Sequence, residues 1–260
     1  MLKESFSQPS PSSLSDETKR PRSRAIPKES QAEKLLSEME NMTAHALLGT
    51  TEWLSSKSRS ELMLFYQDLF ERFKNDDYDK ETFVLKKHRN ETDADLMERL
   101  KALCQIIEDA SRHTPEQPVL TSHALPALFN FGIKTFVSKF YDGAAALTMF
   151  NLAKEDLALY AVLCNQATYN EMLKVYWLFY GKASLYEVEL MVVEMVNNGF
   201  KGDLETFAIL RKILLSYHTM RMGKTVYNPR GSPIWSAEDE RRAANLGMKL
   251  QQVGARFARR

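Results

Sequence analysis

Paired helical runs fill the second half of the chain, and they constrain its fold more than any other feature of the sequence. Three successive pairs have apolar residues at helical spacing: 122–141 with 142–160, 166–181 with 184–198, and 204–220 with 236–260. Alternating strand patterns are nearly absent. A single helix pair cannot bury its apolar face alone, so such pairs stack on one another. The sequence therefore predicts an all-α fold in which antiparallel helix pairs stack as a short α-solenoid.

The first half of the chain is also helical in pattern, with runs at 30–48, 58–74 and 90–112. Their predicted core positions follow i, i+3, i+4 spacing and include Leu62, Phe65, Tyr66, Leu69, Phe70, Phe73, Leu96, Leu100, Leu103, Ile106 and Ile107. The predicted core positions of the second half are Leu173, Trp177, Leu190, Met195, Phe207 and Leu210. Thr92 and Ser236, each followed three residues later by an aspartate, are predicted to cap helices.

These runs divide the chain into three predicted segments. Residues 1–30 are rich in Ser, Pro and basic residues and contain no apolar run, so we expect a disordered N-terminal segment without a secretory signal. Acidic residues in this segment make it a poor match to a mitochondrial presequence. Residues 31–114 are predicted to form N-terminal helices, and residues 122–260 a helix-pair solenoid of about three degenerate repeats.

Charge is distributed unevenly along a chain whose formal net charge is only +1. Residues 211–260 carry 11 Lys and Arg against 3 Asp and Glu, so this end has a local balance of +8. A basic end on a near-neutral chain is a candidate surface for a polyanion. The alternative is a solvated helix face followed by a basic tail.

Signals of catalysis, metal binding and membrane insertion are missing from the sequence. There is no glycine-rich phosphate loop and no G-x-S-x-G, and the five histidines form no i, i+4 pair. The two cysteines, Cys104 and Cys164, have no disulfide-framework or metal-ligand spacing. The longest apolar stretch, 124–150, is interrupted by charges and is interpreted as buried helices. We therefore expect a protein that is not an enzyme and that has no metal or cofactor.

A repeated motif links two of the helical runs. "TYN" begins at Thr168, and the related "TFA" begins 38 residues later at Thr206; the residues between them include Glu194, Met195, Gly199 and Asp203. This order resembles the pentatricopeptide repeat. The unit departs from that pattern because Gly202 stands where proline is usual, three extra residues lengthen it, and Ala208 replaces the expected asparagine. Only this unit matches well, so the predicted solenoid is pentatricopeptide-like with degenerate repeats.

The block "ALTMFNLAKEDLALYAVLCNQATYNEMLKVYW" at 146–177 resembles the C-terminal region of the fungal mitochondrial transcription factor two family. The resemblance covers residues 60–260. It implies a protein of the mitochondrial matrix that acts in transcript stability or in coupling transcription to translation. The implied partners are mitochondrial RNA polymerase or translational-activator proteins, and any inner-membrane association would be through a partner.

The resemblance to pentatricopeptide repeats also implies a site for single-stranded mitochondrial RNA. In that family two side chains of a unit read one base, and the matching positions here are Asn170 and Asp203, a combination that favours uracil. The alternative is that Asn170 faces solvent near a helix start and that Asp203 caps the helix at 204. Four cations of the basic C-terminal end are candidate phosphate contacts: Arg211, Lys212, Arg241 and Arg242. They would equally form a docking face for an acidic partner.

Two functions remain open from the sequence. The first is an RNA-binding factor, or a component of an RNA complex, that acts in mitochondrial mRNA stability, processing or translation. The second is a helical protein–protein adaptor that couples mitochondrial transcription to membrane-associated translation without touching RNA. Few convincing repeats favour the adaptor, because one or two bases cannot specify a transcript. The basic C-terminal end favours RNA.

Overall fold

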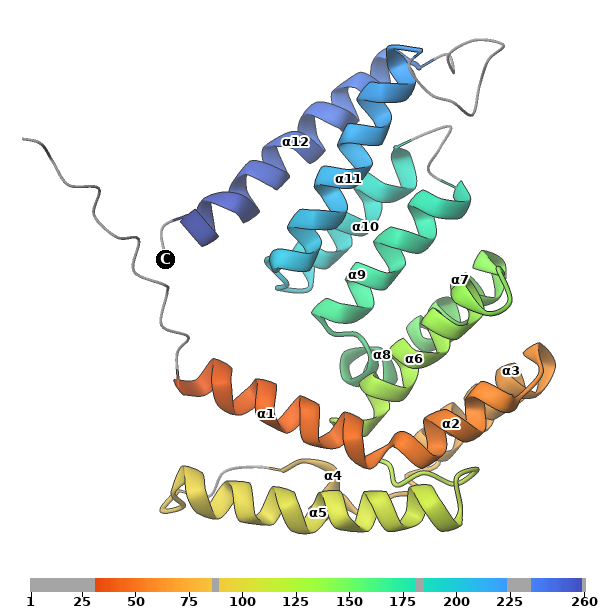
Figure 1. Ribbon diagram of the computed structural model, residues 1–260, viewed down its shortest axis with the longest axis vertical. Coiled ribbons are helices and arrows are strands. Elements are labelled where there is room, and N and C mark those ends of the chain that lie inside the picture. The colour runs from red at the N-terminus through yellow and green to blue at the C-terminus, as the bar shows by residue number, and fades with distance from the viewer. Residues whose placement is uncertain (1–30, 86–88, 181–184, 224–234, 259–260) are drawn as a thin grey trace, which may run out of the picture.

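The computed structural model describes residues 31–85, 89–180, 185–223 and 235–258. These ranges contain 12 α-helices and one π-helical turn, and no strand lies within them (Figure 1). The all-α prediction is confirmed. The predicted disorder of residues 1–30 lies outside the described residues.

Five helices make up the first half: α1 (Gln31–Ala46), α2 (Leu48–Ser56), α3 (Arg59–Lys74), α4 (Lys80–Phe83) and α5 (Asp93–His113). Helix α5 packs along both α1 and α2. The backbone N–H of Thr50 donates to Ser111 Oγ at 2.6 Å where α2 and α5 meet. Gly49 permits this approach, because a Cβ there would lie 2.5 Å from the Ser111 carbonyl oxygen. The predicted run 30–48 ends where α2 begins, and no predicted run covers α2.

The second half contains the predicted helix pairs: α6 (Ala124–Ser138), α7 (Gly143–Lys154), α8 (Leu157–Leu163), α9 (Gln166–Val175), the π-turn η1 (Tyr176–Tyr180), α10 (Tyr186–Asn197), α11 (Leu204–Arg221) and α12 (Ala237–Ala258). Helix α6 packs on α7, α9 on α10, and α11 on α12. Helix α9 also packs on α6 and on α11, so it connects the three pairs (Figure 1). A pentatricopeptide-like solenoid stays a prediction.

Local chemistry decides where these helices begin and end. Thr92 and Ser236 both exchange hydrogen bonds with the aspartate three residues on, which confirms the two predicted caps. Asp156 accepts from the N–H of Leu159, and this cap starts α8 and divides the predicted run 142–160. Gly199 and Gly202 have φ of +87° and +85°, a conformation that favours glycine and turns the chain from α10 into α11.

One buried core extends from Met39 in α1 to Leu246 in α12. Helices α1, α2 and α3 contact α6, and α3 also contacts α7, so the first half packs directly on the helix pairs. The predicted division into residues 31–114 and 122–260 stays a prediction.

Most predicted core positions are buried, and the exceptions follow from tertiary packing. All six positions of α3 are buried, as are Leu173, Met195 and Leu210. The predictions for Leu190 and Ile106 are wrong, because these side chains are 48% and 55% exposed. Both lie on helix faces that no other described element covers. Trp177 is only partly buried against the core, and Phe207 is partly buried beside Gly254 of α12.

Candidate nucleic-acid interface

The motif residues meet where α9 packs on α11. Asp203 caps α11 by accepting from the N–H of Thr206 at 2.7 Å. Asn170 Nδ2 donates to Asp203 Oδ1 at 3.0 Å, and Asn170 Oδ1 accepts from Thr206 Oγ1 at 2.6 Å. The predicted proximity of Asn170 and Asp203 is therefore confirmed, and so is the cap. The alternative in which Asn170 faces solvent is wrong, because its side chain is 0% exposed.

Two further side chains close this site. Gln166 Nε2 lies 3.4 Å from Asn170 Oδ1 and 3.1 Å from Thr206 Oγ1, while Gln166 Oε1 accepts from the N–H of Gly202 at 3.0 Å. Glu205 Oε2 accepts from Asn170 Nδ2 at 3.3 Å. We call this set of residues the closed junction. The polar atoms of Asn170 all have partners, so a base could reach them only by displacing a hydrogen bond.

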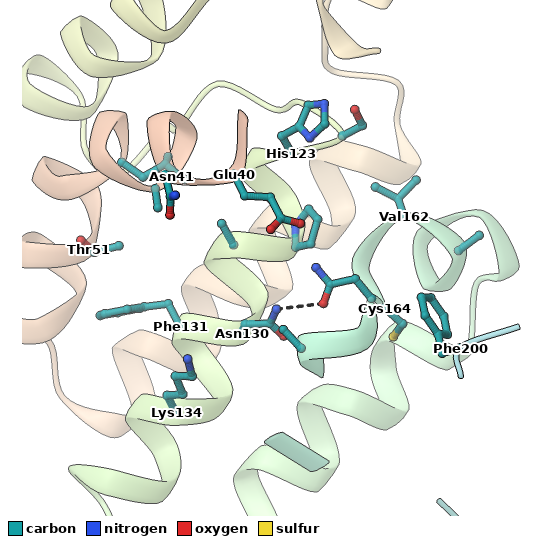
Figure 2. A pocket seen from close by; sticks show the side chains of 18 residues that line it. Glu40, Asn41, Thr51, His123, Asn130, Phe131, Lys134, Val162, Cys164 and Phe200 are labelled. Carbon is teal, nitrogen blue, oxygen red and sulfur yellow. Dashed lines mark hydrogen bonds between the residues drawn. The ribbon is translucent and has the colours of Figure 1, made fainter. Parts of the chain in front are cut away.

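The same arrangement recurs one helix pair earlier, where α6 meets α9. Asn165 caps α9 by accepting from the N–H of Thr168 at 3.0 Å. Asn130 Nδ2 donates to Asn165 Oδ1 at 3.2 Å (dashed line in Figure 2). Asn130 Oδ1 accepts from Thr168 Oγ1 at 2.8 Å. Asn130 and Asn165 thus stand where Asn170 and Asp203 stand in the closed junction.

The sequence analysis missed this second site. Asn165 precedes Asp203 by 38 residues, the same spacing that relates Thr168 to Thr206. That spacing was the available signal. Asn130 lies in "LFNFG", which does not resemble "TYN", so nothing local indicated that it would face a helix cap.

The residues that seal the closed junction are absent from the earlier one. Four residues before Asn130 stands Pro126, where the closed junction has Gln166. Two residues after the cap stands Ala167, where the closed junction has Glu205. Pro126 and Ala167 both line a cavity of about 770 Å³ that also borders α1 and α8. We call this site the open junction.

The open junction presents amide groups and aromatic rings to its cavity. Asn165 Nδ2 makes no hydrogen bond to any described residue, and Asn130 Nδ2 uses one of its two hydrogens. Phe131, Phe200 and His123 line the same cavity (Figure 2). Burial lowers the pKa of His123. The cavity is large enough for a small organic ligand and combines apolar walls with a few polar groups.

Lysines occupy matching places on the first helices of the three pairs. Lys134 and Lys174 lie four residues after Asn130 and Asn170, and Lys212 lies six residues after Thr206, as Lys174 does after Thr168. Lys134 pairs with Glu171 at 3.5 Å and Lys174 with Glu205 at 2.7 Å.

The three lysines differ in how far carboxylates compensate their charge. Burial alone would lower the pKa of Lys174, but its bonds to Glu205 and Glu171 outweigh burial and raise it. Lys212 and its neighbour Arg211 are exposed and form no ion pair within the described residues. Two of the four cations predicted to contact phosphate are therefore accessible and uncompensated.

The other two predicted cations are held by carboxylates. Arg241 pairs with Glu238 at 2.6 Å on the surface of α12. Arg242 lies over the Tyr186 ring at 5.2 Å and pairs with Glu189 at 3.5 Å, which joins α12 to α10. Arg242 thus has a structural role in this pairing. The RNA contact of both arginines stays a prediction.

The described ranges contain no group of His, Cys, Asp and Glu residues placed to hold a metal ion. None of their helices combines the length and apolar character that crossing a bilayer requires. Cys104 and Cys164 are separate buried thiols whose pKa is raised by burial.

Comparison with known proteins identifies the family. The model of the Mtf2 family matches residues 28–256, and the chain belongs to this family. No curated protein and no solved structure matches it. The resemblance to the mitochondrial transcription factor two family is thereby confirmed. Membership implies a mitochondrial location and a role in mitochondrial gene expression, in association with transcription machinery such as RNA polymerase. The family is of transcription-factor type and not one of enzymes.

Proposed function

We propose that this Mtf2-family protein binds single-stranded RNA along α6, α9 and α11, and through this acts in mitochondrial mRNA stability, processing or translation. The observation that carries the proposal is the open junction. Its amide hydrogens face a cavity with aromatic walls, as reading of an unstacked base requires.

At the open junction, the base would be held by its edge and by its face. The free Nδ2 hydrogens of Asn165 and Asn130 donate to acceptors, so they select a base edge that presents carbonyl oxygens, as uracil does. The rings of Phe131 and Phe200 supply apolar surface for a base to pack against. We assign the uracil preference first to this junction. The closed junction contributes a second base only if Gln166 moves.

The phosphates of the RNA would contact cations on the first helices of the three pairs. Arg211 and Lys212 are exposed and form no ion pair with a described residue, so they supply the first contacts, and Lys134 and Lys174 join when their partly exposed ion pairs open. Arg241 reaches phosphate by leaving Glu238. Surface pairs of this kind are worth about 0–1 kcal/mol, so phosphate competes for them readily. Binding should accordingly fall steeply with salt.

A binding assay with a donor-deleting variant tests the proposal. Asn165→Asp keeps the oxygen that caps α9 and removes the Nδ2 donor. Fluorescence anisotropy with a short U-rich RNA at low salt should show about tenfold weaker binding, or about 1.4 kcal/mol. Asn151→Asp is the matched control, because Asn151 is exposed on α7 and lies outside the cavity.

Two outcomes would overturn the proposal. Equal loss of affinity in Asn165→Asp and Asn151→Asp would mean that added negative charge alone explains the effect. Absence of RNA binding by the wild-type chain at low salt would favour the adaptor function, in which the protein joins transcription to membrane-associated translation through protein contacts alone.

A further inference from the structure

The second helices of two neighbouring pairs differ in what they expose. On α7, the exposed positions are Ala144, Thr148, Asn151 and Lys154. On α10, they include Tyr186, Leu190, Val193 and Val196, of which the last three are 48%, 48% and 43% exposed. Exposed apolar side chains grouped on one helix face mark an interaction surface, whereas scattered ones do not.

Val193 and Val196 border a groove between α10 and α12. It encloses about 430 Å³, and its lining includes Val192, Val193 and Val196 from α10 and Leu246 and Met248 from α12. Met248 is 57% exposed. Helix α10 has 12 residues and is therefore about 18 Å long, which matches three turns of a helix laid beside it.

Charge in this α10–α12 groove is not balanced. Glu189 lines it but already pairs with Arg242 at 3.5 Å and accepts from Asn245 at 2.7 Å. Lys249 also lines it and forms no ion pair with any described residue. Burial lowers the pKa of Lys249, and the charge of Arg256 lowers it further. The uncompensated charge of the groove is therefore positive, and an anionic group would relieve it.

We propose that the α10–α12 groove is the docking site for an acidic amphipathic helix of a partner protein. Apolar residues of that helix at i, i+3 or i+4, and i+7 occupy the groove between Val193 and Met248. A carboxylate at its edge pairs with Lys249. The site lies on the second helices of the pairs, apart from the junctions to which RNA was assigned, so it goes beyond the proposed RNA binding.

Selection from a peptide library tests the two proposed features of the partner, which are its helical apolar spacing and its acidic charge. A random peptide library with about 16 variable positions, long enough to cover the groove as a helix, is selected on the full chain. It is counter-selected on Val193→Glu, which places a charge in the groove at an exposed position. The expected winners have helical apolar spacing and an excess of Asp and Glu.

Two matched pairs of variants then locate the binding of the best peptide. Lys249→Glu should weaken it by about tenfold, and Lys201→Glu, an exposed lysine outside the groove, should leave it unchanged. Val193→Glu should remove binding, and Thr148→Glu at an exposed position on α7 should not.

The proposal is overturned by enrichment of basic peptides, by no wild-type-specific enrichment, or by peptides that bind Lys249→Glu undiminished. Light scattering that shows a dimer of the wild-type chain, lost in Val193→Glu, would assign the groove to a second copy instead. U-rich RNA that displaces the selected peptide from the wild-type chain and itself binds Val193→Glu more weakly would assign the groove to RNA.

Discussion

The open and closed junctions are built from the same kinds of side chains, yet they offer different surfaces. Each has an asparagine on one first helix that bonds the cap residue and the capping threonine of the next. In the closed junction Gln166 and Glu205 complete the hydrogen bonds of Asn170. In the open junction Pro126 and Ala167 cannot do so, and a cavity remains.

This difference shows that a recognition motif and a recognition site need not coincide. The stretch that matches the repeat pattern best is the one whose asparagine is buried and fully bonded. Of the two junctions, the one whose sequence matches the pattern less well has an amide donor with no partner among the described residues. Mutations at the closed junction should therefore mainly lower stability, whereas mutations at the open junction should mainly lower RNA binding.

The largest expected effect is on the helix that both junctions share. Leu173 lies in α9 and is completely buried, so Leu173→Ala should lower the free energy of unfolding by about 2–5 kcal/mol. Urea denaturation followed by circular dichroism measures this, and Leu190→Ala, at an exposed position, is the control. An unchanged midpoint would mean that α9 is not packed as described.

The next effect distinguishes the two asparagines. Asn170→Ala removes the bonds that the Asn170 amide makes to the Thr206 hydroxyl and the Asp203 carboxylate in a buried site, and should cost about 2–3 kcal/mol of unfolding free energy. Asn130→Ala acts beside an open cavity that water can enter, and should cost about 1 kcal/mol. The same denaturation assay compares them. Equal losses would remove the distinction between the junctions.

A smaller change in stability, with a large change in binding, is expected when the open junction is filled. Ala167→Glu with Pro126→Gln copies the residues of the closed junction and should abolish RNA binding, while lowering stability less than Asn170→Ala does, because it removes no buried hydrogen bond. Glu205→Ala is the reciprocal variant and should leave RNA binding intact or stronger. RNA affinity that is unaffected by filling the cavity would contradict the base site.

The smallest expected effect is a pH dependence confined to the open junction. His123 lines its cavity, and burial holds the pKa of this histidine below its usual 6.5. The unfolded chain then binds the proton more readily than the folded one, so stability is present above the unfolded pKa and is lost as the pH falls below it. Thermal melts should show a shallower loss of stability from pH 7 to pH 5 in His123→Gln. A steeper loss in that variant would reverse the assigned sign.

The sequence by itself determined the features that arise within a few residues of one another. Helical spacing predicted the all-α fold and the burial of Leu173, Met195 and Leu210. Cap residues predicted the starts of α5 and α12. Both kinds of prediction succeed because a cap and an amphipathic face are encoded by residues three or four apart, whatever the rest of the chain does. The contact between Asn170 and Asp203, which are 33 residues apart, was instead predicted from the resemblance to a known repeat.

Only the tertiary structure decided which of these features are accessible. Leu190 has core spacing but lies on a face of α10 that no described helix covers. Arg242 has the charge of a phosphate contact but pairs with Glu189 on another helix. Asn130 meets Asn165 across 35 residues, and the cavity beside them exists because Pro126 and Ala167 come together there. Such contacts depend on how separate helices pack, and no local pattern records them.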